Sequence, residues 1–175
     1  MRFREHFGIA KDVAGEKAGF FYLTGSLFPD YVERHRIHRS DETLGLIKKR
    51  IYRIQHTSNP LVKDYLLGTV MHYMCDYCCY SHGDKYYEMI HHRKFENAEQ
   101  EYFRKHSRKK YLINAEAFYR KNRDKNKKLS IEKTLKRREN YIENLNSTHW
   151  WSDERIMKAD LYYAYALCYY IYRTV

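Results

Sequence analysis

The stretch Asn59–Glu96 reads NPLVKDYLLGTVMHYMCDYCCYSHGDKYYEMIHHRKFE, and its first part decides the fold. Asn-Pro is a strong helix start, because Asn caps a helix and Pro suits its first turn. From Pro60 to about Ser81 the sequence is apolar on nearly every side, which is typical of a buried helix. The dipeptide Gly83-Asp84 ends this pattern. The sequence therefore predicts that this segment is the central helix of the molecule.

Helical periodicity continues on both sides of this segment, and no alternating strand pattern is visible. Further helices are expected over residues 5–16, 41–56, 130–144 and 153–172, with one more that begins near Tyr86 or His91 and passes Tyr102. Expected helix caps are Asp41, Ser130 and Ser152. The stretch GSLFPD at residues 25–30 predicts a turn, because Gly and Pro stand four apart. We expect an all-α, single-domain bundle of six or seven helices over residues 1–175.

The net charge of +11 is concentrated in one segment. Residues 93–139 hold 17 Lys/Arg against 7 Asp/Glu, a net charge of +10. Such a basic helical region is able to meet the phosphates of nucleic acid or of an anionic membrane. The alternative is a pair of charge-rich helices that only face solvent. The Tyr-rich segment 152–173, which includes the last expected helix, has no charged residue from Leu161 to Tyr172. Its aromatic side chains are expected to pack in the core, with a substrate wall as the alternative.

The four cysteines do not form a disulfide framework. Cys75, Cys78 and Cys79 share one expected helical turn and point to different sides of it. We interpret them as small buried side chains and not as a thiolate zinc site. No signal peptide pattern opens the sequence, and no apolar run is long enough to span a bilayer, so we expect a cytoplasmic protein with reduced cysteines.

Two pairs of metal-ligand residues stand at helical spacing in the opening stretch. His72 and Asp76 are four apart, His92 and Glu96 are four apart, and His82 lies between the pairs. A spacing of four places both members on one helix face, and imidazole with carboxylate is the usual ligand set of catalytic zinc. Each pair alone also fits an ordinary ion pair. A buried Asp76 needs compensation, however, either from a metal ion or from a basic side chain of another helix.

These spacings resemble the metal-binding core of the zinc-dependent phospholipase C family, which is related in fold to the fungal single-strand-specific zinc nucleases. The similarity covers the metal-binding core at residues 2–101, including Leu67-Gly68 ahead of the first histidine. It also implies ligands earlier in the chain. These are His6, Asp30 and His38, with His35 as the competing choice for the last position.

The resemblance implies an all-helical fold that holds up to three zinc ions. The first ion would be bound by Asp30, His38, His72 and Asp76. The second would be bound by His82, His92 and Glu96. The third would be bound by His6, the amine of Met1 and a bridging Asp76.

The activity implied by this resemblance is hydrolysis of a phosphodiester, most naturally of a phospholipid headgroup. The zinc cluster would activate a water molecule, and Asp30 would orient or deprotonate it. One alternative keeps the metals and acts on single-stranded nucleic acid. Another is a non-catalytic helical module that binds anionic membrane or a partner protein through residues 93–139.

Overall fold

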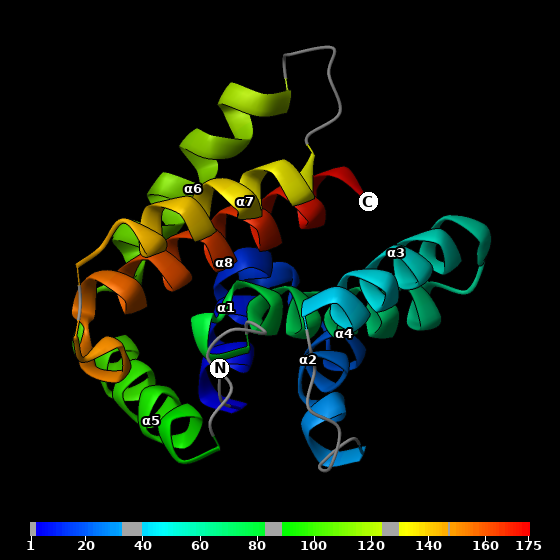
Figure 1. The fold of residues 1–175 in the computed structure, drawn as a ribbon. Helices are drawn as coiled ribbons and strands as arrows, with labels where there is room; N and C mark the ends of the chain where they lie inside the picture. Colours follow the sequence, from blue (N-terminus) through cyan, green and yellow to red (C-terminus); the bar gives the residue numbers. More distant parts are fainter. Residues whose placement is uncertain (1–2, 33–39, 83–88, 124–129, 147) are drawn as a thin grey trace.

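The computed structural model describes residues 3–32, 40–82, 89–123, 130–146 and 148–175. These parts of the chain form eight α-helices, three short 3-10 helices and no strand (Figure 1). The α-helices are α1 (Phe3–Ala14), α2 (Phe20–Val32), α3 (Ser40–His56), α4 (Pro60–Cys78), α5 (Met89–Lys105), α6 (Arg108–Arg123), α7 (Ile131–Glu143) and α8 (Glu154–Thr174). The 3-10 helices are η1 (Gly15–Lys17), η2 (Tyr80–His82) and η3 (Trp150–Ser152). The all-α prediction is confirmed, whereas the predicted number of helices was too low.

Helix α4 lies at the centre of the fold, as predicted (Figure 1). The Asn59 side chain caps it by accepting hydrogen bonds from the backbone N–H groups of Leu61 and Val62. From Leu66 onward nearly every side chain is buried, because α2, α3 and α8 all pack against this helix. The α-helix ends at Cys78, three residues before the predicted end, and the chain continues into η2.

Helix α2 occupies the place where a turn was predicted, so that prediction was wrong. The helix runs through residues 25–30 with Pro29 inside it. Gly25 serves a close crossing with α4, since a Cβ there would lie 2.1 Å from the backbone oxygen of Tyr65. On the other side a Cβ at Gly68 would lie 2.0 Å from the backbone oxygen of Tyr22. The two glycines let the helix backbones touch, and this packing places Asp30 in the last turn of α2.

The helix expected to pass Tyr102 is confirmed as α5, which ends at Lys105. A separate helix that was not predicted, α6, begins at Arg108. Helix α8 is capped by Asp153, whose side chain accepts from the backbone N–H of Arg155, and not by Ser152. The cap predicted at Ser130 is confirmed, because its hydroxyl accepts from the backbone N–H of Lys133. The side chain of the other predicted cap, Asp41, lies outside the described residues.

Helix α8 supports the other half of the molecule. Helices α6 and α7 pack on α8, and α1 contacts α2, α4 and α8 (Figure 1). The Tyr165 hydroxyl donates to the carboxylate of Asp12 over 2.6 Å, which ties α8 to α1. All four cysteines are free thiols in this core, as predicted. Among the described helices, none is both long and apolar enough to cross a membrane.

Candidate metal centre

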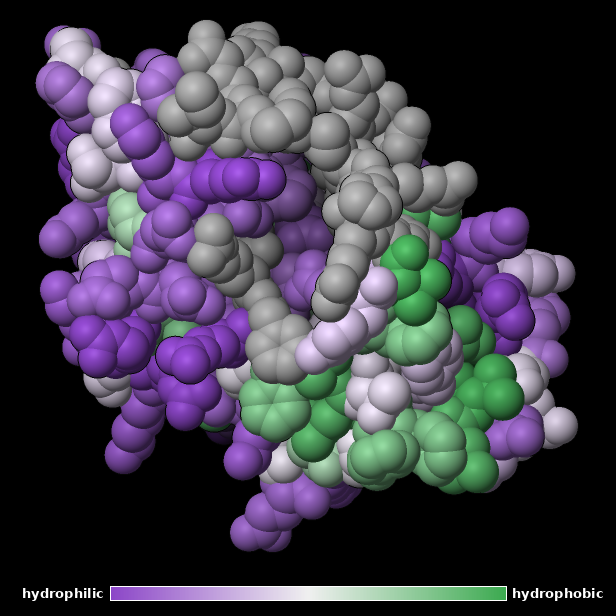
Figure 2. All heavy atoms as spheres, turned by 90° about the horizontal axis from the view of Figure 1, so that it is seen from below, coloured by the Kyte–Doolittle hydropathy of each residue, from purple (hydrophilic) through white to green (hydrophobic). Residues whose placement is uncertain are grey.

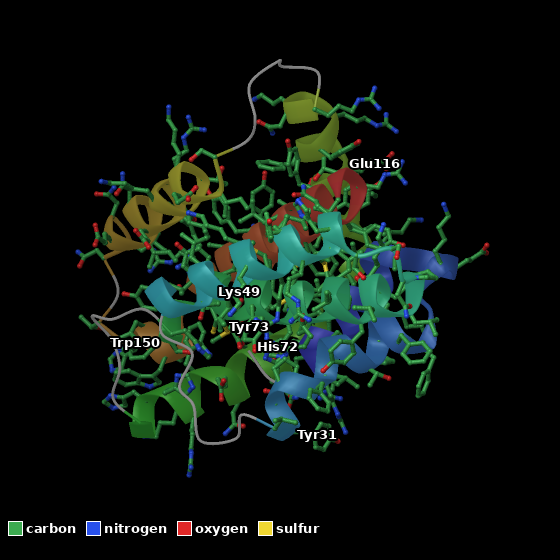
Figure 3. All side chains as sticks on the ribbon, turned by 90° about the vertical axis from the view of Figure 1, so that its right-hand side faces the viewer. Tyr31, Lys49, His72, Tyr73, Glu116 and Trp150 are labelled. Carbon is green, nitrogen blue, oxygen red and sulfur yellow. The ribbon has the colours of Figure 1, made fainter. Side chains whose placement is uncertain are left out.

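Helix α4 supplies the first pair of the candidate site. His72 and Asp76 are both buried and stand one turn apart, with His72 Nε2 3.1 Å from Asp76 Oδ2. Figure 3 shows His72 in the interior, where the helices meet. The pair lies on an apolar helix that crosses α2 at close range, so neighbouring elements can place further polar groups against it.

Helices α1 and α2 bring His6 and Asp30 to this pair. His6 Nε2 lies 3.0 Å from Asp76 Oδ1, and His6 Nδ1 lies 3.3 Å from Asp30 Oδ2. Asp30 Oδ1 is 3.9 Å from His72 Nε2. The ring centroids of His6 and His72 are 4.0 Å apart. We call these four residues the first set; three are fully buried, whereas the Asp30 side chain is 36% exposed.

A second set lies beside the first and consists of His82 from η2 with His92 and Glu96 from α5. Glu96 Oε1 is 3.4 Å from His92 Nε2 and 3.6 Å from His82 Nε2. His82 Nε2 also lies 3.9 Å from Asp76 Oδ1, which joins the two sets. The residues singled out on spacing alone therefore come from three elements and converge on one place.

Backbone carbonyl groups orient two of the histidines. His72 Nδ1 donates to the carbonyl oxygen of Ser26 over 3.1 Å, and His92 Nδ1 donates to that of Ser81 over 3.2 Å. A carbonyl oxygen only accepts, so each neutral ring carries its proton on Nδ1 and presents an unprotonated Nε2 to the carboxylates. This is the arrangement in which histidine binds a metal ion. Sequence reasoning could not identify Ser26 or Ser81, because only their backbone carbonyl groups take part in these contacts.

The two sets fit zinc by their chemistry and their geometry. In each set three side chains offer ligand atoms within 4.8 Å of one another: His6, His72 and Asp76 in one, and His82, His92 and Glu96 in the other. His6 Nε2 is buried and makes no hydrogen bond of acceptable geometry within the described part of the chain, although a carboxylate oxygen is 3.0 Å away. Nitrogen and oxygen atoms that approach without hydrogen-bond geometry are expected where an ion sits between them.

The charges of the first set shift the pKa values of its members. Burial lowers the pKa of His72 below its ordinary value, and the charge of His6 adds to this effect. For His6, burial acts in the same direction but is outweighed by the carboxylates of Asp76 and Asp30, so its pKa is raised well above the ordinary value. Burial would raise the pKa of Asp76, but the nearby histidines hold it well below its usual range. Asp76 is therefore ionised at neutral pH, which is the state that a carboxylate needs to bind a metal ion.

A buried ion pair braces the turn that carries His82. Arg138 of α7 donates to Asp160 Oδ1 and to the carbonyl oxygen of Cys78, both over 2.7 Å. The other oxygen of Asp160 accepts the backbone N–H of Tyr80 over 2.6 Å. These bonds fix the backbone where α4 ends and η2 begins. Arg138 belongs to the basic region 93–139 but is buried in the fold, which counting the charges did not predict.

A third group of possible ligands, Cys79, Glu99 and Asp160, does not have the character of a zinc site. Burial raises the pKa of the Cys79 thiol well above its ordinary value, so the thiol keeps its proton and donates to Glu99 Oε2 over 3.4 Å. Asp160 is already engaged by Arg138 and the Tyr80 backbone. This agrees with the prediction that the cysteines are buried side chains and not thiolate ligands.

The structure brings together seven of the eight side chains that the resemblance implied as ligands: His6, Asp30, His72, Asp76, His82, His92 and Glu96. His38 and its competitor His35 lie outside the described residues, as does Met1. The resemblance assigned His6 to a third ion with a bridging Asp76. In the structure its Nε2 lies 3.0 Å from Asp76 Oδ1, and its ring lies directly beside His72.

Comparison with known proteins relates the chain to a protein family. The family model described as zinc dependent phospholipase C matches residues 9–152 of the chain. No curated protein and no solved structure matches the chain. The matched residues hold every described member of both sets except His6, and they extend over most of the 175 residues. The chain belongs to the zinc-dependent phospholipase C family.

Proposed function

We propose that this protein is a zinc-dependent phosphodiester hydrolase whose substrate is a phospholipid headgroup. The observation that carries the proposal is the convergence of two imidazole–carboxylate sets, joined at Asp76, on one place in the fold. Membership of the zinc-dependent phospholipase C family supports the choice of metal and of substrate class.

The side chains of both sets would hold the metal ions. His6, His72 and Asp76 would bind one ion, and His82, His92 and Glu96 another, with His38 or His35 completing the first set. In the arrangement that the family resemblance implies, His6 would instead serve a third ion, together with the amine of Met1 and a bridging Asp76. Bound zinc supplies a Lewis acid that polarises a phosphoryl oxygen and lowers the pKa of water.

Asp30 is our candidate for the residue that handles the proton. Its Oδ2 is engaged by His6, which leaves Oδ1 on the side of His72. Burial would raise its pKa, but the hydrogen bond and charge of His6 lower the pKa below the ordinary value, so the carboxylate is ionised at neutral pH. Because this side chain is also the most exposed of the first set, it is accessible to both water and substrate. Oδ1 would orient the attacking water and accept its proton.

The test is hydrolysis by zinc-loaded protein of phosphatidylcholine, a chromogenic phosphodiester and single-stranded DNA. His72→Ala should lower the rate by at least about 100-fold, because loss of a side chain that binds the metal costs more than loss of a residue that only orients such a side chain. His56→Ala is the matched control, since His56 is an exposed histidine on α3 and should leave the rate unchanged.

Three results would contradict the proposal in different ways. Equal rates for wild type and His72→Ala would show that the sets do not catalyse the reaction. Hydrolysis of single-stranded DNA but not of phospholipid would favour the nuclease alternative, in which the basic residues 93–139 attract phosphates. A protein that retains no zinc and gains no thermal stability on zinc addition would be a non-catalytic helical module.

A further inference from the structure

Exposed hydrophobic side chains are concentrated on one part of the surface. Of the eleven large hydrophobic residues that are exposed in the described part of the chain, seven belong to α2 or to the start of α4. They are Phe20, Phe21, Phe28, Tyr31, Val32, Leu61 and Val62. Figure 2, which views the molecule from the side on which α2 ends, shows hydrophobic side chains gathered on one part of that face. A gathering of this kind marks an interaction surface, whereas single exposed side chains do not.

The geometry of α2 explains why these residues share a face. At 3.6 residues per turn, the five exposed residues of α2 fall within an arc of roughly 120°. The rest of the helix carries its buried residues, Tyr22, Gly25, Ser26 and Pro29, and Gly25 lies directly against the backbone of α4. Phe28 also contacts Tyr65 of α4, with ring centroids 5.7 Å apart, so the surface continues from one helix to the other. We call it the α2–α4 face.

The α2–α4 face borders the metal centre. Asp30 lies between Phe28 and Tyr31 in the last turns of α2, and its carboxylate reaches His6. Figure 3 shows Tyr31 at the outer edge of the molecule and His72 in its interior. Around the helix Asp30 points roughly 100° away from Tyr31. The exposed aromatic residues and the metal centre therefore lie on different sides of the last turns of α2, and Asp30, the member of the first set that is open to solvent, stands next to Tyr31 in the chain.

We propose that the α2–α4 face docks on the surface of a phospholipid bilayer. This inference rests on the proposed function, because a hydrolase of phospholipids must reach headgroups that stay in the membrane. Helix α2 carries no charged residue except Asp30, and Phe, Tyr, Val and Leu are side chains that enter the interface between headgroups and acyl chains. The net charge of +11 would add a long-range attraction to anionic bilayers, but most of this charge belongs to residues 93–139 and not to the α2–α4 face. Near the face, the exposed Lys17 and Lys63 each stand next to an acidic residue in the sequence, which offsets their charge. The hydrophobic residues would therefore provide the contact between this face and the bilayer.

The experiment measures binding of the full chain to vesicles and uses paired variants. Phe20→Ser with Phe28→Ser removes two aromatic residues from the face. Tyr52→Ser with Tyr141→Ser removes two aromatic residues of comparable exposure elsewhere, and serves as the control. Vesicles are made of phosphatidylcholine alone or of equal parts of phosphatidylcholine and phosphatidylglycerol. The first variant should lower the vesicle partition coefficient by at least about tenfold on both vesicles, while the control stays at the wild-type value.

A second readout reports the contact directly and does not depend on loss of a side chain. Tryptophan fluorescence of Phe28→Trp should shift to shorter wavelength when vesicles are added, and that of Tyr52→Trp should not. Thermal midpoints and oligomeric state are measured for each variant. Equal partitioning of both paired variants would overturn the proposal, as would a wild-type dimer that dissociates when Phe20 and Phe28 are changed, since the face would then join two copies. Vesicle binding without any phosphodiester hydrolysis would refute the proposed activity and leave the docking face intact.

Discussion

Gly68→Ala tests the link between the helix crossing and the metal centre. A Cβ at this position would lie 2.0 Å from the backbone oxygen of Tyr22 and 2.8 Å from the backbone nitrogen of Ser26. Ordinary contact begins near 3.4 Å, so α2 and α4 must separate by about 1.4 Å. The groups that would have to yield are backbone atoms of a helix, which cannot rotate away as a flexible side chain can.

The expected cost follows from this clash. Overpacking at the upper end of the usual range destabilises by about 3 kcal/mol, and the better helix propensity of Ala recovers about 1 kcal/mol. A net loss of about 2 kcal/mol lowers the Tm of a domain of this size by roughly 4–8 °C. The separation also draws the Ser26 carbonyl away from His72 and moves Asp30, so we expect zinc affinity to fall at least about tenfold.

The assays are thermal unfolding of the metal-free protein and zinc titration at neutral pH. Gly45→Ala is the matched control, because Gly45 is an exposed glycine inside α3 with no atom within 4 Å of an added Cβ. It should raise stability by up to about 1 kcal/mol and leave zinc affinity unchanged. A Gly68→Ala protein with wild-type Tm and zinc affinity would refute the account of this crossing.

Three further predictions concern other parts of the fold. Arg138→Met leaves Asp160 buried without its basic partner and should lower the free energy of unfolding, measured with a chemical denaturant, by about 3–5 kcal/mol. The control Arg137→Met changes an exposed residue and should stay within about 0.5 kcal/mol of wild type. Equal losses in the two variants would contradict the role given to the ion pair. Asn59→Ala removes the cap of α4 and should cost about 1 kcal/mol, with Ser58→Ala as the neutral neighbour, and no difference between them would argue against the cap. Because carboxylates raise the pKa of His6 well above 6.5, this residue is protonated in the metal-free protein at neutral pH, so zinc binding should release a proton and tighten as the pH rises towards that pKa. The same shift adds stability to the metal-free protein that is complete below pH 6.5 and is lost as the pH rises through the raised pKa. Calorimetry in buffers of different ionisation enthalpy counts the proton, and a count that His6→Gln leaves unchanged would exclude His6 as its source.

The central helix could be predicted because its signals are local. Asn59 and Pro60 mark its start, and the apolar run beyond them marks its burial; both are properties of a short stretch of sequence. The turn predicted at residues 25–30 failed for the opposite reason. Gly25 is small because α4 crosses there, and that contact lies forty residues away along the chain. Local patterns do not distinguish a glycine that turns the chain from a glycine that admits another backbone.

The candidate site also combines features that are local in the sequence with contacts between distant parts of the chain. The pairs within one helix, such as His72 with Asp76, follow from a spacing of four. The approach of His6 and Asp30 to that pair was indicated only by resemblance to a family, since three different helices have to meet. The carbonyl groups that orient His72 and His92, and the Arg138–Asp160 pair that braces η2, have no sequence pattern at all. These contacts depend on backbone position and become visible only in the structure.

The central claim is that the two sets hold zinc, and an anomalous difference map collected at the zinc absorption edge tests it most directly. Crystals of zinc-loaded protein should show one peak among His6, His72 and Asp76 and another among His82, His92 and Glu96. The second peak should vanish in His92→Ala while the first remains. Peaks confined to the group of Cys79, Glu99 and Asp160, or no bound zinc at either set, would contradict the account.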